Sequence, residues 1–117
     1  MTTIQTDTTA WQAKQGVASV QSYVLTESDG TTPIDISADT VTLYVSPNKG
    51  QEAVLTIVGD VATLGNEGKV TFTLTEAQTQ ALTVPNYFYE VVWDDGTNPP
   101  EFVAQGDFLV EQTFFWR

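Results

Sequence analysis

Residues 87–111 read YFYEVVWDDGTNPPEFVAQGDFLVE, and this stretch decides the fold class. Its first part, Tyr87–Trp93, carries large apolar side chains on both faces of an extended chain, which is typical of a central strand or of a strand facing a partner. Asp95-Gly96 is the strongest signal for a hairpin turn. Residues 101–111 can then pair back on this strand, with Gly106 as the expected bulge or point of close approach.

Turn-forming residues recur at intervals of roughly ten residues before this hairpin, and that spacing is typical of a β-sandwich or barrel. Thr, Val, Tyr and Phe dominate between the turns, as the half-buried surface of a sheet favours. We therefore predict an antiparallel β-sandwich of seven to nine strands. The expected strands before the hairpin are residues 17–26, 34–36, 40–46, 53–58 and 69–74, with a further short one at 61–64.

One short helix interrupts the strand pattern near residues 76–82. Thr75 and Gln78 have the spacing of a capping box, in which the two residues satisfy each other's backbone N–H groups. Pro85 prevents the helix from continuing, so we expect one or two turns that connect the sheets. The apolar residues expected on one face of this helix are Ala77, Ala81 and Leu82.

The charge balance is strongly acidic: 15 Asp and Glu residues against 4 Lys and Arg residues give a net charge of -11. The four cations are far apart in the sequence, so they do not form the cluster that phosphate groups require. We expect no nucleic-acid partner and no membrane binding. The 117 residues suit one domain, no stretch approaches the ~20 apolar residues of a membrane span, and the N-terminus lacks the features of a signal peptide.

Histidine and cysteine are both absent, which excludes a Ser-His-Asp triad, a thiolate nucleophile, a disulfide framework and the usual zinc ligands. A glycosidase needs two carboxylates about 5–10 Å apart in a cleft, and Glu90, Asp94, Asp95 and Glu101 lie near aromatic residues in the sequence. Asp94 and Asp95 fall in a predicted turn, where Asp serves the backbone. We expect no enzyme activity, no catalytic residue and no cofactor.

Calcium binding is a weaker alternative. Residues 28–35 (SDGTTPID) and 94–98 (DDGTN) place carboxylates near backbone carbonyls, and hard cations prefer such oxygens. The spacing of an EF-hand is absent, however, and turn chemistry accounts for both segments. We therefore expect no metal site, and a carbohydrate- or calcium-binding sandwich stays as an alternative.

The two ends of the chain differ from its centre. Residues 1–16 are polar and predict an N-terminal arm with, at most, one short strand; residues 17–112 would form the β-sandwich, and residues 113–117 an aromatic C-terminal tail. Trp11 in the arm is costly to expose, so it should fill a pocket on its own domain or on a neighbour.

The tail contains three consecutive aromatic residues, Phe114, Phe115 and Trp116. They cannot all enter one core when extended, because successive side chains point to opposite faces. They either pack on both sides within the domain or contact another subunit; chain ends fray unless something holds them, which favours the subunit contact. The predicted interface residues are Trp11, Phe114, Phe115 and Trp116.

The order of these signals is also that of a known family. The segments that carry the resemblance are PIDIS (33–37), VTLYV (41–45), GKVTFTLTEAQTQAL (68–82), NYFYEVVWDDG (86–96) and FVAQGDFLV (102–110). Over about residues 16–110, the sequence resembles the immunoglobulin-like β-sandwich modules of tailed-phage virion proteins, in particular the N-terminal domain family of upper baseplate proteins. The resemblance implies an all-β, immunoglobulin-like sandwich. Family members commonly continue into a larger distal region, so we expect a small stand-alone virion component here.

With this resemblance, the turn segment 28–46 has a structural interpretation. Asp29-Gly30 makes a turn, and Pro33 suits an edge strand because it cannot donate a ladder hydrogen bond. Ile34 and Ile36 would fill the end of the sandwich, while Asp35 between them would point to solvent.

The function implied by the resemblance is structural: a tail or baseplate component of a tailed-bacteriophage virion, assembled in the host cytoplasm. We expect it to act through protein–protein contacts with other virion proteins, as a homo-oligomer in a symmetric assembly. A capsid decoration or head-associated protein is the first alternative, and a carbohydrate- or calcium-binding module is the second.

Overall fold

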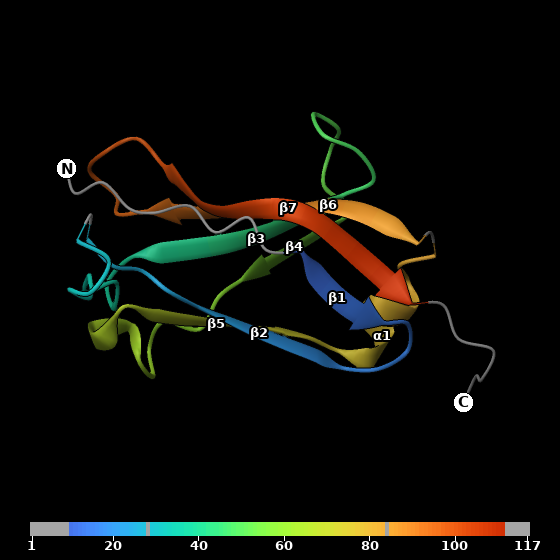
Figure 1. Ribbon diagram of the computed structural model, residues 1–117, viewed down its shortest axis with the longest axis horizontal. Helices are drawn as coiled ribbons and strands as arrows, with labels where there is room; N and C mark the ends of the chain where they lie inside the picture. The colour runs from blue at the N-terminus through green and yellow to red at the C-terminus, as the bar shows by residue number, and fades with distance from the viewer. Residues whose placement is uncertain (1–9, 28, 84, 112–117) are drawn as a thin grey trace.

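The computed structural model describes residues 10–27, 29–83 and 85–111 of the chain. Within these residues the chain forms seven strands and two short helices, arranged as two facing sheets (Figure 1). The strands are β1 (Trp11–Lys14), β2 (Ser19–Val24), β3 (Thr40–Ser46), β4 (Leu55–Val58), β5 (Lys69–Leu74), β6 (Asn86–Asp94) and β7 (Glu101–Glu111). The helices are the 3-10 helix η1 (Gly65–Glu67) and the α-helix α1 (Glu76–Gln80).

The larger sheet has the strand order β1-β7-β6-β3-β4, and the smaller sheet pairs β2 with β5. A two-layer arrangement with β7, β6, β3 and β4 side by side in one sheet is that of immunoglobulin-like sandwiches. The chain is therefore an all-β, immunoglobulin-like sandwich with one short α-helix, which confirms the predicted fold class. The expectation that every pair is antiparallel needs one correction: β1 and β7 run parallel, with Trp11 opposite Phe108.

The larger sheet includes residues 11–14, which the sequence analysis placed in an N-terminal arm. Trp11 and Ala13 of β1 point inward and are 2% and 7% exposed, so the alternation that defines a strand is present in this short segment. Residues 11–14 of the expected arm are therefore a strand of the sandwich, the one short strand that the sequence allowed there.

The core lies between the sheets and consists of alternate residues from each strand. Tyr89 and Val91 of β6 and Leu43 of β3 are completely buried against Phe72 of β5. The strand β6 lies between β3 and β7, which confirms the first of the two positions, central or facing a partner, that its two apolar faces predicted. Since the sequence has no cysteine, packing joins the two sheets without a disulfide.

The helix α1 has the predicted capping box. The backbone N–H of Gln78 donates to the Thr75 hydroxyl over 3.2 Å, and the Thr75 N–H donates to Gln78 Oε1 over 2.8 Å. Its buried face differs from the expected one: Thr79 and Leu82 are buried, whereas Ala77 is exposed. The buried Thr79 hydroxyl donates a hydrogen bond to the backbone carbonyl of Val17 over 3.0 Å. This bond offsets the cost of removing the hydroxyl from water.

Two of the predicted short strands are absent from the described residues 29–83. Residues 34–36 form no strand; beside them, Pro33 makes an isolated bridge with Thr26. Ile36 is completely buried, as expected for the end of the sandwich. Residues 61–64 form a turn that leads into η1. Gly68 ends η1 with φ 79°, and a Cβ atom there would lie 2.6 Å from a backbone oxygen, so this position requires glycine.

Candidate interaction surface

Alternate residues of the larger sheet point away from the core and form its outer face. The strand register places Phe102 opposite Val92, Val92 opposite Thr42, and Thr42 opposite Val58. One row of side chains therefore crosses β7, β6, β3 and β4. Phe102 is 51% exposed and Val58 is 67% exposed. We call Phe102, Val92, Thr42 and Val58 the outer row.

A β-bulge in β7 places Phe102 in the outer row. Val91 pairs with Ala104 and Val92 pairs with Phe102, so Val103 is an extra residue, and Val103 and Ala104 are both buried. In a strand without the bulge, Phe102 and Ala104 would share a face, and Phe102 would point inward. The sequence analysis expected the irregularity at Gly106, which instead continues the regular pairing with β6.

Polar and aromatic side chains surround the outer row. Tyr44 is 39% exposed and lies opposite the half-buried Glu90. Phe88 packs under Lys49, whose Nζ atom lies 4.8 Å from the ring centroid, a cation–π contact. The face therefore combines a mostly apolar row, in which Thr42 is the polar member, with a polar surround, as protein interfaces do.

The carboxylates considered for calcium binding cap their own turns. Asp29 accepts hydrogen bonds from the Thr32 hydroxyl at 2.5 Å and from the Thr32 and Thr31 N–H groups at 2.9 Å each. These bonds, the hydroxyl first, lower the pKa of Asp29 to about 2. The hydroxyl and N–H of Ser37 lower the pKa of Asp35 in the same way.

The hairpin loop between β6 and β7 uses its carboxylates similarly. The Asn98 side chain, followed by the Asn98 and Thr97 N–H groups, lowers the pKa of Asp95. Asp94 accepts the Gly96 N–H over 2.8 Å. Across residues 10–27, 29–83 and 85–111, no three or more His, Cys, Asp or Glu side chains are grouped to hold a metal ion. The geometry of these loops is that of turn capping.

Trp11, one of the predicted interface residues, fills the core of its own domain. Its ring centroid lies 5.0 Å from that of Phe108 and 5.9 Å from that of Tyr89. Its indole N–H donates to the Ser19 hydroxyl of the other sheet over 3.2 Å. The sequence allowed Trp11 to fill a pocket either on its own domain or on a neighbour, and in the structure it fills one on its own domain. The other predicted interface residues, Phe114, Phe115 and Trp116, lie outside the described residues.

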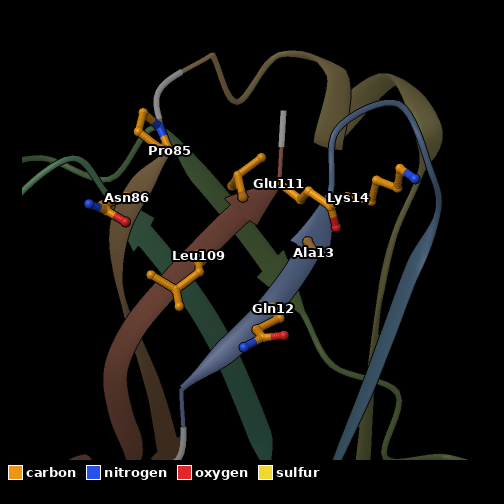
Figure 2. A pocket seen from close by; sticks show the side chains of 8 residues that line it. Gln12, Ala13, Lys14, Pro85, Asn86, Leu109 and Glu111 are labelled. Atoms are coloured by element: carbon orange, nitrogen blue, oxygen red, sulfur yellow. The ribbon is translucent and has the colours of Figure 1, made fainter. Parts of the chain in front are cut away.

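A hollow of about 480 Å³ lies on the outer face at the end of β7. Figure 2 shows Leu109 of β7 between Gln12 of β1 and Asn86 of β6, with Pro85 and Glu111 at its edges. Sequence reasoning missed both this hollow and the outer row, because each depends on the pairing of strands that are far apart in the chain.

Helices long and apolar enough to cross a membrane do not occur in the part of the chain that the structure describes.

No protein-family model matches the sequence, and no curated protein matches it. Among solved structures, a point mutant of the SrpA adhesin from Streptococcus sanguinis is similar at 13% identity and a TM-score of 0.45, over 94% of this chain and 55% of the adhesin chain. This chain thus spans about half the length of that one. A mutant titin I27 domain is similar at 10% identity and a TM-score of 0.42, over 100% of this chain and 95% of the titin chain.

Proposed function

We propose that this chain is a structural module that binds other protein subunits in a symmetric assembly through its outer row. The observation that carries the proposal is the exposure of Phe102 and Val58, at 51% and 67%, on one continuous row across four strands. Exposed apolar side chains that gather on one face of a protein are typical of contact sites. The bulge that turns Phe102 outward adds to this support, because bulges often re-aim a side chain for use.

The energetics of the outer row suit a specific contact. A few well-packed anchor residues contribute most of the binding energy of an interface, each often on the order of 2 kcal/mol or more. The net charge of -11 makes free copies repel each other at long range. A neutral or basic rim on the partner therefore fits this surface better than another acidic one.

We further propose that the assembly is the virion of a tailed bacteriophage and that the chain is a tail or baseplate component. The support is the sequence resemblance over about residues 16–110, together with the immunoglobulin-like sandwich. A head-associated position would use the same kind of contact with different neighbours, so fold alone does not separate the two.

Substitutions in the outer row test the binding role. Phe102→Ser and Val58→Ser should keep the fold, measured by circular dichroism, and should reduce incorporation of the chain into purified virions. The matched control is Val20→Ser on the smaller sheet, where Val20 is 61% exposed; it should be incorporated normally. Full incorporation of both outer-row variants would disprove the role of this face.

Electron microscopy of antibody-labelled particles tests the location. Label at the tail or baseplate is expected. Label on the head would select the alternative position, and particles without the chain would refute the virion proposal.

A further inference from the structure

The smaller sheet has an open edge along β2. Within the described residues, β5 is the one strand that pairs with β2, and it lies on one side of it (Figure 1). Native proteins usually protect an edge strand with charged residues, proline or a bulge, because its backbone N–H and C=O groups can pair with a further strand. The strand β2 reads SVQSYV, without charge or proline, and its register with β5 is regular.

One bridge on the far side of β5 shows which backbone groups of β2 face the open side. The Thr71 N–H donates to the Asp60 carbonyl over 3.2 Å, and the Thr71 carbonyl accepts from the Asp60 N–H over 2.8 Å, so both groups of Thr71 point away from β2. Ser22 lies opposite Thr71, and its N–H and C=O therefore point away from β5, to the open side. The same holds for Val20 and Val24, because this direction alternates along a strand.

The side chains along this edge suit a second copy of the same chain. Val20, Ser22 and Val24 are exposed on the outer face of the smaller sheet, the two valines at 61% and 59%. Their order, Val-Ser-Val at every second position, is the same in both directions. When two copies of β2 pair antiparallel with Ser22 opposite Ser22, each Val20 therefore lies opposite a Val24, and such apolar cross-strand pairs stabilise a sheet.

The charge distribution also favours this edge. Two copies with a net charge of -11 repel each other, but the charged residues that flank β2 in the sequence are Lys14 and Glu27, so residues 15–26 are uncharged. On β5, the residue opposite Val24 is the cation Lys69. Copies that meet through β2 therefore bring no carboxylate opposite another one along the paired strands.

We propose that two copies of the chain pair through β2, antiparallel and around a two-fold axis at Ser22, so that their two-stranded sheets become one continuous sheet. Each of the facing pairs Ser22–Ser22 and Val20–Val24 then exchanges two backbone hydrogen bonds, which supply the affinity in strand addition. The contact is isologous and closes as a dimer. It goes beyond the proposed function, because it adds a second contact and leaves the outer row of the larger sheet free for other subunits.

Charge substitutions at Ser22 test the pairing, because a residue on the two-fold axis faces its own copy. The full chain should sediment as a dimer. Ser22→Glu alone and Ser22→Lys alone should each weaken the dimer about fivefold, since like charges then lie directly opposite. An equimolar mixture of the two variants should dimerise as tightly as the parent. The matched control, Thr73→Glu at an exposed position of β5, should also dimerise like the parent.

Circular dichroism verifies that each variant is folded. A full chain that stays monomeric would overturn the inference, whether water or another segment covers its edge. A mixture that dimerises no more tightly than the separate variants would overturn it as well. Val20→Ser, the control for the outer row, keeps the backbone groups of this edge, so failure of the dimer and failure of the proposed function are distinguishable.

Cysteine cross-linking gives a second readout, because the chain has no cysteine of its own. The Cα atoms of a facing hydrogen-bonded pair are about 5.5 Å apart, within the range that a disulfide spans, so Ser22→Cys should form a covalent dimer under mild oxidation. In the control Thr73→Cys, the two cysteines would be three strand spacings, or about 14 Å, apart. This control should give less than about a tenth as much product, since that distance is too long for a disulfide. Equal yields from the two variants, or no product from Ser22→Cys, would overturn the proposal.

Discussion

Trp11 joins the two sheets at the first described strand. Its ring packs on Phe108 of β7, with centroids 5.0 Å apart, and its indole N–H reaches Ser19 of β2 over 3.2 Å. At 2% exposure, the side chain has lost nearly all contact with water. The short strand β1 therefore contributes a large buried aromatic side chain to the core.

Replacing Trp11 with Ala should destabilise the folded chain by about 3–5 kcal/mol, because it removes a buried aromatic group and leaves a cavity. Urea denaturation measures the loss. Val20→Ala, at a position that is 61% exposed, is the control and should change stability by about 0.5 kcal/mol or less. If Trp11 mattered only for contacts between subunits, the isolated chain would unfold at the same urea concentration in both variants.

Asp29 gives a prediction about pH. Its folded pKa of about 2 lies below the ordinary value of 3.8, so the ionised carboxylate stabilises the turn above pH 3.8. That contribution is lost as the pH falls from 3.8 towards 2. An NMR titration should therefore show a midpoint near 2.

The Thr32 hydroxyl is the largest cause of the lowered pKa of Asp29. Thr32→Val should therefore raise this pKa, whereas Thr32→Ser, which keeps the hydroxyl, should leave it low. An unchanged titration in Thr32→Val would show that the backbone N–H groups alone set the value.

At the scale of secondary structure, the helix α1 depends on its first turn. It has five residues, too few for a stable helix without packing and capping. The reciprocal bonds between Thr75 and Gln78 supply the capping, and the burial of Thr79 and Leu82 supplies the packing.

Thr75→Ala should lower the free energy of unfolding by about 1 kcal/mol, since it leaves an N-terminal backbone N–H without its acceptor. Thermal or urea unfolding measures the change. Thr83→Ala, at an exposed position beyond the helix, should have little effect. Equal losses in both variants would mean that the capping box adds nothing to stability.

The presence of the strands was predictable from the sequence, because the alternation of apolar and polar side chains along a strand is set by residues that are close together in the chain. Residues 40–46, 69–74 and 101–111 match β3, β5 and β7 as the structure has them. The parallel pairing of β1 with β7 was not predictable, because alternation within a strand carries no information about which distant strand lies beside it.

The candidate site was less predictable for the same reason. Phe102 reaches the outer face only because Val103 is accommodated as a bulge opposite β6, and no turn-forming residue marks that position. The aromatic character of Trp11 correctly indicated a pocket, but it could not tell a core from an interface. The predicted role of residues 114–116 as interface residues stays a prediction.

At the scale of the whole molecule, the acidic surface opposes association. Every copy carries a net charge of -11, so two copies repel each other at long range, and dissolved salt screens that repulsion.

Self-association should therefore strengthen when NaCl is raised from about 20 mM to about 300 mM, a change that shortens the screening length well below the size of the molecule. Sedimentation at both concentrations measures it. A chain whose association weakened with added salt would be held together by ion pairs instead of apolar contacts.

The parallel pairing of β1 with β7 has a mechanical consequence. Tension applied to the chain before Trp11 and after Glu111 pulls the two strands in opposite directions along their shared axis. The hydrogen bonds across the register from Trp11–Phe108 to Lys14–Glu111 would then bear the load together instead of opening one after another. In single-molecule pulling, the domain should resist stretching through its ends more strongly than stretching between one end and the loop at Gly96. This geometry therefore makes the domain itself resistant to tension along the chain.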